Sequence, residues 1–281
     1  MSEEGCLYIC ATPIGNIADV SSRLVEVLSS VDLIAAEDTR VARMLLSHLQ
    51  IKFPEIISCF EGNEVKRSHE ICDLIETGKK IALISDAGTP AISDPGYIIV
   101  REIINRGLKY AVIPGPSALT AALCGSGLDS SHFHFEGFLP PKSGERQKRL
   151  KQISGIGETI VLYESPHRIE KTVTDIVSVF HPDTKITIGR ELTKLYEEFI
   201  HCKCSELNYT LSGITKKGEF VIIIENKQQQ TQNILPPLNN QVIKFLESGV
   251  SPKTISSLLV DFYDVSKREI YQKCLEFIKE N

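Results

Sequence analysis

Short apolar runs alternate with amphipathic stretches through the first half of the chain. The apolar runs predict five strands, at residues 7–11, 31–36, 54–59, 81–85 and 108–115. The stretches between them have helical spacing; one covers residues 20–30 with Asp19 as its N-cap, and another ends at Gly107. Strands that alternate with helices in this way predict a mostly parallel, doubly wound α/β layer that extends to about Gly127.

Residues 81–96, IALISDAGTPAISDPG, are the most distinctive stretch of this layer. The predicted strand is followed by a loop that contains two glycines and two prolines. Ligands bind at the carboxyl ends of strands in open α/β sheets, so this loop is a candidate ligand site. We expect Asp86 at the mouth of the sheet and Gly88 where the backbone approaches the ligand. Pro90 and Pro95 are expected to stiffen the loop.

The second half of the chain has less regularly spaced strands with longer polar ends. Five segments there are strand-like, namely HFHFEGFLP, TIVLYES, KITIGRELT, EEFIHCKC and GEFVIIIEN. Ser117 is placed to begin a helix of small residues, and Ser165 with Pro166 is placed to begin another that runs to Val179. This half is therefore predicted to form a second sheet, with antiparallel character.

The C-terminal part begins with a polar segment, NKQQQTQNILPPLNN, whose composition predicts a linker. Three helical stretches follow. Ser251 with Pro252 begins the second of them, and Ser266 with Glu269 forms a capping box at the start of the third. Helix, short turn and helix is the outline of a helix-turn-helix unit. From Gln241 onward the chain has six basic and six acidic residues, so this unit lacks the positive charge of a strong DNA-binding domain.

The composition is that of an ordinary globular protein. The 281 residues are 42% hydrophobic and 24% charged, enough to bury a core in two or more domains. No apolar run reaches the roughly 18 residues of a membrane helix, and the acidic start MSEEG lacks the head of a signal peptide. We therefore expect a cytoplasmic protein with no membrane partner. Eight cysteines without a C-x-x-C pair indicate buried thiols, neither a disulfide framework nor a zinc site.

Two phosphate-binding motifs are absent from the sequence. There is no G-x-x-x-x-G-K-[ST], and no G-x-G-x-x-G follows the first predicted strand. A P-loop and a standard dinucleotide fingerprint are therefore excluded, and the ligand of the 81–96 loop must be held in another way. The net charge of -5 also leaves a polyanionic partner only local basic patches to bind.

Seven strings of the sequence carry a resemblance to a known family: ATPIGN, AEDTR, SDAGTPAISDPG, PGPSAL, FEGFLP, YESPHR and RELTK, in that order. They are similar to motifs of the ribosomal small-subunit methyltransferase I family, a branch of the tetrapyrrole (corrin/porphyrin) methylase fold. Its members 2′-O-methylate a decoding-centre cytidine of small-subunit (16S) rRNA. The resemblance spans residues 7 to about 224, and the C-terminal helices resemble the family's appended helix-turn-helix domain. It implies S-adenosylmethionine bound between two αβα domains, and a homodimer.

The resemblance also implies domain boundaries and cofactor contacts. The two αβα domains are expected at 1–116 and 117–226, a linker at 227–240 and the helical domain at 241–281. The expected cofactor contacts are Ile14, Asp86, Ala87, Gly88, Ala91, Ser117, Ala118, Glu164 and Leu192. Backbone groups of such glycine- and alanine-rich loops can hydrogen-bond the two ends of the cofactor, and a nearby carboxylate or carbonyl favours the sulfonium charge.

The implied chemistry is attack of a ribose 2′-hydroxyl on the methyl group of a sulfonium. The protein then provides orientation and desolvation, and a carboxylate or a neutral amine can take the proton. The candidate catalytic residues lie at predicted strand ends and are Glu37, Asp38, Arg40, Glu61 and Lys194, with Glu64 and Glu191 as further carboxylates. The candidates for phosphate contacts are Arg40, Arg168 and Arg190. The acceptor is expected to be single-stranded or distorted rRNA, free or in the small ribosomal subunit.

Residues 60–64, FEGNE, depart from the HEHNE-like string that the family leads one to expect after the third strand. A role that depends on those imidazoles cannot be carried over to this chain. The polar side chains that remain are Glu61, Asn63 and Glu64.

Several of these residues also have a purely structural interpretation. For the strand-end carboxylates the alternative is a solvated strand end with a helix N-cap. The basic residues after FLPP can bind RNA or can form a solvated helix face; they are Arg146, Lys148, Arg149 and Lys151. His132 and His134 lie on one face of a strand but lack a third ligand, so no metal site is expected.

Three functions remain open from the sequence. The first is the rRNA 2′-O-methyltransferase. The second is an S-adenosylmethionine-dependent methylase of a tetrapyrrole-type small molecule, which has less use for the basic helix and the C-terminal helices. The third is a helix-turn-helix regulator with a degenerate enzyme domain, and the balanced terminal charge and the intact motifs argue against it.

Overall fold

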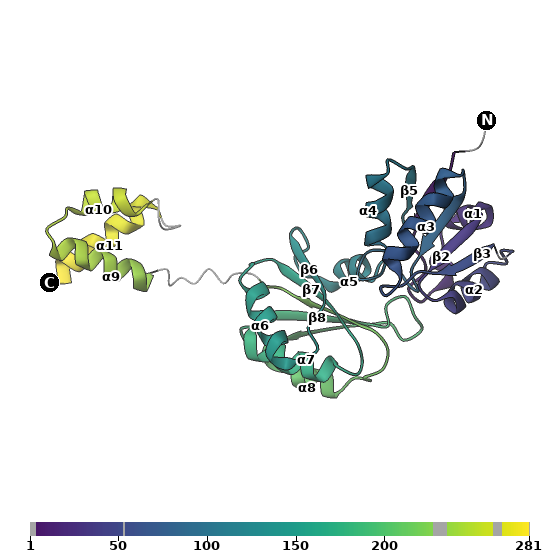
Figure 1. The fold of residues 1–281 in the computed structure, drawn as a ribbon. Coiled ribbons are helices and arrows are strands. Elements are labelled where there is room, and N and C mark those ends of the chain that lie inside the picture. The colour runs from purple at the N-terminus through teal and green to yellow at the C-terminus, as the bar shows by residue number, and fades with distance from the viewer. Residues whose placement is uncertain (1–3, 53, 227–234, 261–265, 281) are drawn as a thin grey trace. The chain divides into compact units, whose positions relative to one another are not determined.

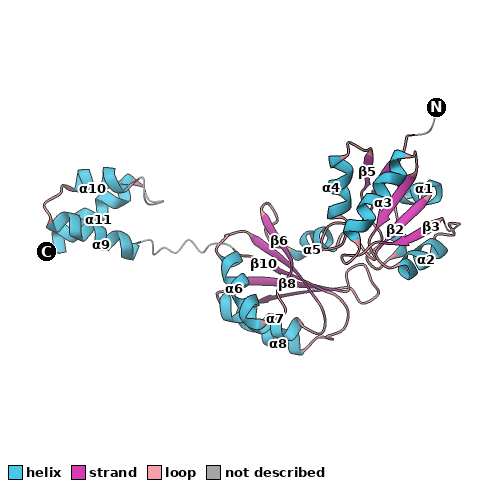
Figure 2. Ribbon diagram, viewed as in Figure 1, coloured by secondary structure: helices cyan, strands magenta, loops and turns pink. Residues whose placement is uncertain are grey.

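The structure is a computed structural model that describes residues 4–52, 54–226, 235–260 and 266–280. The chain divides into two compact units, residues 1–227 and residues 228–281 (Figure 1). The first unit contains two separate five-stranded sheets with helices, and the second is helical (Figure 2). The predicted α/β class is therefore confirmed. Among the described helices, none is both long and apolar enough to span a membrane.

The first sheet is parallel throughout. Its strands are β1 (Cys6–Cys10), β2 (Leu33–Ala36), β3 (Glu55–Ser58), β4 (Lys80–Ile84) and β5 (Tyr110–Ile113). They lie in the order β3-β2-β4-β1-β5, and Ile9 of β1 is in register with Leu83 of β4. The central strands are short, apolar and buried on both faces, as parallel strands between two helical layers are.

Helices cover both faces of the first sheet. α1 (Ser22–Ser30) and α2 (Thr39–His48) pack on one face, around Ile34 and Ile84. α3 (Glu64–Glu76) and α4 (Tyr97–Asn105) pack on the other, around Ala35 and Leu83. This arrangement confirms the doubly wound layer predicted from the alternation of strands and helices.

The first helix begins later than the sequence suggested. Asp19 was expected to be its N-cap, but the structure places Asp19 in a short 3-10 helix, η1 (Ile17–Asp19), which Asn16 caps. The N-cap of α1 is Ser21, whose Oγ accepts a hydrogen bond from Leu24 N–H at 3.1 Å. Asp and Ser are both favourable N-cap residues. Because Asp19 lies inside the short 3-10 helix, Ser21 is the residue that caps α1.

The second sheet is mixed. Its strands are β6 (Phe133–Phe138), β7 (Thr159–Glu164), β8 (Lys185–Arg190), β9 (Glu198–Lys203) and β10 (Phe220–Ile224), in the order β6-β7-β10-β8-β9. β6 and β7 are parallel, whereas the other three pairs are antiparallel. The antiparallel character predicted for this half is confirmed.

Side chains of the second sheet alternate between two cores. Ile222 points to the face covered by α6 (Ser143–Ser154), α7 (Ile169–Val179), η2 (Cys204–Glu206) and α8 (Leu207–Ser212). Val221 and Ile223 point to the other face, where α5 (Ala118–Ser126) packs. α5 approaches closely, because a Cβ at Gly125 would stand 2.2 Å from the Phe199 ring. The helix of small residues predicted after Ser117 is therefore present, and its small side chains allow this close approach.

The expected start of α7 was wrong. Ser165 and Pro166 were predicted as N-cap and first residue, but the helix begins at Ile169 with Arg168 as its N-cap. Residues 165–168 form a turn in which Arg168 N–H donates to Ser165 C=O at 3.1 Å. The turn delays the helix and leaves Ser165 and Pro166 at the end of β7, beside the cavity described below.

The C-terminal unit contains α9 (Leu235–Glu247), α10 (Pro252–Leu259) and α11 (Lys267–Glu280). α9 begins inside the segment predicted to be a linker; residues 227–234 of that segment lie outside the described residues. The predicted caps are confirmed. Ser251 Oγ accepts from Thr254 N–H at 3.2 Å, and Ser266 N–H donates to Glu269 Oε2 at 2.8 Å in the capping box.

Candidate active-site cavity

The carboxyl ends of β1 and β4 form a switch point in the first sheet. These neighbouring strands are followed by α1 and α4, which lie on opposite faces. A ligand crevice is expected outside the strand ends at such a point. The loops after the two strands are joined by a pair of hydrogen bonds. Thr12 N–H donates to Gly88 C=O at 2.8 Å, and Gly88 N–H donates to Thr12 C=O at 3.1 Å.

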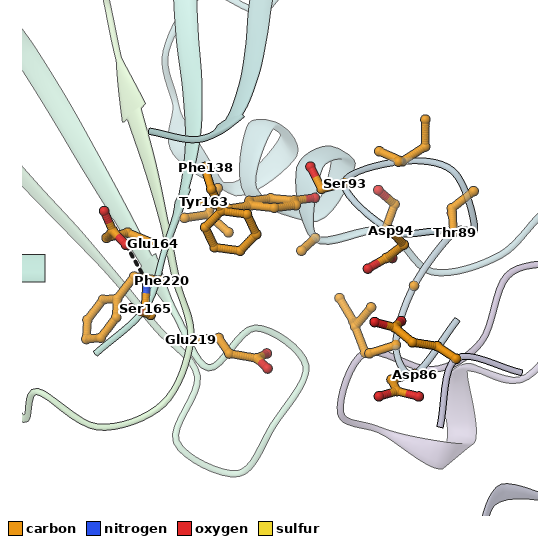
Figure 3. Close-up of a pocket in the computed structure, with 18 of the residues that line it drawn as sticks. Asp86, Thr89, Ser93, Asp94, Phe138, Tyr163, Glu164, Ser165, Glu219 and Phe220 are labelled. Atoms are coloured by element: carbon orange, nitrogen blue, oxygen red, sulfur yellow. Dashed lines mark hydrogen bonds between the residues drawn. The ribbon is translucent and has the colours of Figure 1, made fainter. Parts of the chain in front are cut away.

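A cavity of about 470 Å³ opens beside this pair of hydrogen bonds (Figure 3). Its lining comes from the loops after β1, β2 and β4, from the start of α5, and from β6, β7 and β10. Both sheets of the first unit therefore contribute to it. The volume lies within the range of small-molecule sites, about 300–1,000 Å³.

The loop after β4 has an unusual backbone. Gly88 has a φ of +87°, and a Cβ there would stand 3.3 Å from Ile14 Cγ2. Ala91 and Ser93 also have positive φ, at 68° and 62°, a conformation that costs non-glycine residues about 1–3 kcal/mol each. Ala91 N–H donates to Pro95 C=O at 3.1 Å and closes the turn. Strain of this kind persists only where neighbouring structure holds it, and it clusters at ligand sites.

Three carboxylates from the first sheet, those of Glu37, Asp86 and Asp94, line one side of the cavity, and we call them the acidic wall. None of the three is in an ion pair within the described part of the chain, and no Lys, Arg or His lines the cavity there. Burial and the nearby Glu37 raise the pKa of Asp94 to about 6. Burial and the nearby Asp86 raise the pKa of Glu37. Repulsion among these carboxylates favours a cationic ligand.

The opposite side of the cavity is mostly apolar. Phe138 and Tyr163 line it, and we call them the aromatic wall. Phe220 is also a lining residue, but its side chain is 1% exposed and packs with Ile222 in the core on the other face of the sheet. The Tyr163 ring meets the Phe138 ring edge to face, with centroids 5.8 Å apart, and burial raises the pKa of Tyr163. Figure 3 shows the rings of Phe138 and Tyr163 across the cavity from Asp86 and Asp94. A wall of this kind holds a flat or apolar group by contact.

Two further carboxylates at the cavity are neutralised within the protein. Glu164 is 2% exposed and accepts hydrogen bonds from Thr172 Oγ1 at 2.6 Å and from Ser165 N–H at 2.8 Å. Arg168 lies 3.3 Å from it. Glu219 forms an ion pair with Lys194 at 3.1 Å. The acidic wall therefore differs from these two in lacking a cation.

Most of the expected cofactor contacts lie at this cavity. Those that line it are Ile14, Asp86, Ala87, Gly88, Ser117, Ala118 and Glu164. Ala91 and Leu192 are not among its lining residues. Ala91 turns the loop, and Leu192 is buried in the same apolar cluster as Ile14. Ser117 occupies the N-cap position of α5 but its side chain makes no capping hydrogen bond.

The predicted catalytic residues are not gathered at one point. Glu37 lines the cavity. Asp38 caps α2 by accepting from Arg40 N–H at 2.8 Å and pairs with the Arg40 side chain at 2.5 Å. This contact lowers the pKa of Asp38 to about 2. Glu61 is exposed in the turn before α3, where Asn63 Oδ1 accepts from Phe60 N–H at 2.9 Å.

A groove of about 940 Å³ adjoins the cavity and shares Asp86 with it. One side is the face of α2 that carries Met44 and His48, and the other is the turn at residues 193–195. Met44 is 57% exposed and Leu195 is 89% exposed. Lys194 lies in this groove and not in the cavity. Of the predicted catalytic residues, Glu37 therefore belongs to the cavity and Lys194 to the groove, whereas Arg40 is exposed in the first turn of α2 and lines neither.

The arginines expected to meet RNA are mostly used inside the protein. Arg146 is 2% exposed and lies 2.6 Å from the Asp175 carboxylate, and Arg149 pairs with Glu136 at 2.6 Å. In the basic run of α6, Lys148 and Lys151 are the exposed members. The other two phosphate candidates also have internal partners: Arg168 donates to Leu139 C=O at 2.6 Å, and Arg190 pairs with Glu198.

Sequence reasoning missed several lining residues. Asp94 had a signal, because the distinctive stretch contains Ser-Asp twice, at 85–86 and 93–94, and only the first pair was used. Tyr163 directly precedes the expected contact Glu164. Phe220 and Val221 had no local signal, since β10 reaches the cavity only through its antiparallel pairing with β7.

Comparisons with known proteins show which family the sequence matches. A family model described as Tetrapyrrole (Corrin/Porphyrin) Methylases matches residues 6–208. The ribosomal RNA small subunit methyltransferase I of Pasteurella multocida (strain Pm70) is 39% identical over 274 residues, 97% of each chain. The protein of that name in Escherichia coli O157:H7 is 38% identical over 277 residues, 98% of this chain and 96% of the relative.

Solved structures show the same fold at low identity. Diphthine synthase matches with a TM-score of 0.62 and 14% identity, covering 78% of this chain and 89% of that one. The methyltransferase CobJ matches with a TM-score of 0.58 and 15% identity, covering 78% and 93%. At such identities the similarity concerns the fold alone.

Proposed function

This chain belongs to the tetrapyrrole (corrin/porphyrin) methylase family, in its ribosomal RNA small subunit methyltransferase I branch, and from that premise we propose that it transfers a methyl group from S-adenosylmethionine to the 2′-oxygen of a cytidine ribose in small-subunit rRNA. The cytidine is expected in the decoding centre of 16S rRNA. The names of the relatives favour this acceptor over a tetrapyrrole and over a regulatory role. The single observation that carries the proposal is the cavity with its acidic and aromatic walls.

The cavity suits the methyl donor in charge. S-adenosylmethionine carries a sulfonium and an ammonium, and the acidic wall offers Glu37, Asp86 and Asp94 with no cation of the described chain paired to them. Opposite charges within about 4 Å attract strongly where water is excluded. A positively charged ligand would also relieve the repulsion that raises the pKa of Glu37 and that of Asp94.

The cavity also suits the donor in shape. The backbone at Ala87 and Gly88 and the start of α5 at Ser117 and Ala118 are the groups placed to hydrogen-bond its polar ends. The aromatic wall is placed to cover its adenine, since flat rings pack well against Tyr163. The donor supplies an electrophilic methyl group when it is bound. The protein's part is then to hold both reactants in line and to keep water out.

The acceptor side is proposed to be the groove that shares Asp86 with the cavity. A ribose bound there lies next to the donor site, which a direct transfer requires. Arg40 is exposed on α2 and suits a phosphate contact, and Lys194 suits a contact to the ribose. Asp38 and Glu61 remain candidates on this side, with Asp38 fixing the Arg40 side chain.

Proton removal is assigned to the acidic wall. The acidic wall supplies the unpaired carboxylates next to the proposed acceptor groove, which shares Asp86 with the cavity. An oxygen of one of them would take the proton of the 2′-hydroxyl. We further propose that the protein works as a homodimer, as the family resemblance implies. The proposed domain boundaries are those expected from the sequence, 1–116, 117–226, 227–240 and 241–281.

The test uses small ribosomal subunits and free rRNA from cells that lack this protein. Each is incubated with the protein and S-adenosylmethionine, and the nucleosides are analysed by mass spectrometry. We expect 2′-O-methylcytidine at the decoding centre in at least one of the two substrates, and none with the Gly88→Val variant. A methyl group on a base, or no transfer to either substrate by a protein that binds the donor, would contradict the proposal.

A further inference from the structure

The carboxylate of Glu64 is buried at the end of the loop that lines the cavity. Glu64 is the first residue of α3 and is 5% exposed. Its Oε1 accepts two backbone hydrogen bonds, from Gly96 N–H at 2.9 Å and from Ile98 N–H at 2.8 Å. Glu64 is not a lining residue of the cavity. It therefore contacts the loop on the side away from the cavity, and it lies 32 residues before Gly96 in the sequence.

Within the described part of the chain, Glu64 is the acceptor for both of these amides, and no backbone carbonyl accepts from either. Gly96 is the N-cap residue of α4, with a φ of 138° and no side chain that could cap the helix. The first amides of a helix lack acceptors within the helix, and a buried one costs free energy unless something accepts from it. Glu64 supplies that acceptor from another helix. The positive end of the α4 dipole in turn stabilises a negative charge placed there.

A side chain at residue 96 could not replace Glu64 as the acceptor for these amides. A Cβ at Gly96 would lie 3.2 Å from Ala91 N and 3.3 Å from Leu83 Cδ2. The close approach is part of the turn in which Ala91 N–H donates to Pro95 C=O. The loop therefore needs glycine at 96 and an acceptor from elsewhere.

The segment between these contacts is the one that forms the cavity. Ile92, Ser93 and Asp94 line it. Ala91 and Ser93 hold positive φ, which neighbouring structure must stabilise. At its start the loop is tied to the loop after β1 through Gly88 and Thr12. At its end, within the described residues, the loop is held to α3 by the hydrogen bonds that Glu64 accepts from Gly96 and Ile98.

We propose that Glu64 is a positioning residue: it holds residues 91–96 in the strained shape that places Asp94 on the acidic wall. The identity of the ligand rests on the function proposed above, whereas the hold on the loop does not. Without the carboxylate, the buried amide of Gly96 and the partly buried amide of Ile98 lose their acceptor and the loop relaxes to less strained conformations. The ligand must then restore the shape when it binds, and its affinity falls by the free energy of that ordering.

The experiment compares Glu64→Ala and Glu64→Gln with a matched control, Glu76→Ala. Glu76 is the last residue of the same helix and its side chain is 50% exposed, with Arg106 at 3.3 Å. Hydrogen exchange of the Gly96 and Ile98 amides is measured in the ligand-free protein. Affinity for S-adenosylmethionine is measured by calorimetry, and thermal unfolding is followed in parallel.

We expect Glu64→Ala to speed exchange at both amides and to weaken donor binding by about 10- to 100-fold, the range that one or two unpaired buried amides correspond to. Glu64→Gln keeps one acceptor oxygen, so its donor affinity should stay within about threefold of the wild type. A small loss is expected because a neutral acceptor is weaker than a charged one. Glu76→Ala should change neither exchange nor affinity.

Two results would overturn the inference. One is unchanged exchange at Gly96 and Ile98 in Glu64→Ala. The other is a lower unfolding temperature with donor affinity equal to that of the wild type, because Glu64 would then stabilise the fold without shaping the site. If the wild-type protein itself does not bind the donor, the function proposed above fails; the exchange data then decide the role of Glu64 separately.

Discussion

The two walls of the cavity are built by different means. The acidic wall stands on loops at the carboxyl ends of parallel strands, where backbone strain and repelling carboxylates are held in place by neighbouring elements. The aromatic wall stands on strands of the mixed sheet, where Phe138 and Tyr163 are partners in the pairing of β6 with β7. We expect the first wall to select the charge of the ligand and the second to select its shape. This difference suggests that changes in the acidic wall depend on pH and on the charge of the ligand, whereas changes in the aromatic wall do not.

The largest effect is expected from closing the space beside the acidic wall. Gly88→Val forces a β-branched residue into positive φ and puts its Cβ against Ile14. We expect calorimetry to show donor binding weakened by about 100-fold or more, from strain and overpacking together. Gly107→Val is the control, because Gly107 also has positive φ (67°) but open space around its Cβ position. If both variants lose affinity equally, strain in general and not the cavity is responsible.

A smaller loss is expected from the aromatic wall. Tyr163→Ala removes the ring that meets Phe138 and should weaken donor binding by about tenfold, equally at pH 5.5 and pH 7.5. Tyr163→Phe keeps the ring and should stay within about threefold. A loss that grows or shrinks with pH would show that the aromatic wall also takes part in charge selection.

Asp94→Asn is expected to affect stability and binding in opposite directions. The folded-state pKa of Asp94, about 6, lies above the ordinary value of 3.8 for an aspartate, so its ionised form destabilises the folded protein above pH 6. The variant should therefore unfold at a higher temperature at pH 7.5, by about 2–4 °C, the shift that 1 kcal/mol gives in a chain of this size. The gain should shrink as the pH falls from 6 toward 4, where wild-type Asp94 takes up its proton.

Donor binding by the same variant should follow the opposite pattern. At pH 7.5 the loss of a negative charge should weaken binding by about three- to tenfold. At pH 5 the difference from the wild type should be smaller, because protonated Asp94 is neutral too. Calorimetry at the two pH values checks this, and an equal loss at both would mean that Asp94 acts through its shape and not its charge.

The smallest effect on the cavity is expected from its outer rim. Arg40→Ala removes an exposed cation paired with Asp38, and exposed pairs contribute little to stability. Unfolding temperature and donor affinity should not change measurably. The KM for the rRNA acceptor should rise by about two- to fivefold as one phosphate contact is lost. A fall in donor affinity would place Arg40 at the cavity and not at the groove.

Local patterns predicted much of this molecule. The alternation of apolar runs and amphipathic stretches was enough for the parallel layer, and the place of the loop after β4 at a strand end made it a candidate ligand site, which the structure puts at the cavity. The capping box at Ser266 and the small residues of α5 also needed only neighbouring residues. In each of these cases the residues that decide the structure are close together in the sequence.

Features that depend on distant partners could not be predicted. Arg146 belongs to a basic run, but Asp175, on the next helix, turns it into a buried ion pair. Glu64 belongs to a polar turn, but the amides it binds are 32 and 34 residues away. Phe220 joins the cavity through strand pairing alone. Charge runs and polar turns in the sequence do not reveal which partner the fold brings to them.

We propose above that the acidic wall binds a positively charged methyl donor. The most direct test is calorimetry of S-adenosylmethionine and of S-adenosylhomocysteine, its demethylated product with a neutral sulfur, at pH 7.5. We predict that the wild-type protein binds the sulfonium at least about tenfold more tightly, and that Glu37→Gln and Asp94→Asn each bring the two affinities closer together. If the wild-type protein binds both compounds equally, or if neither substitution changes its preference, the acidic wall does not recognise the positive charge of the donor.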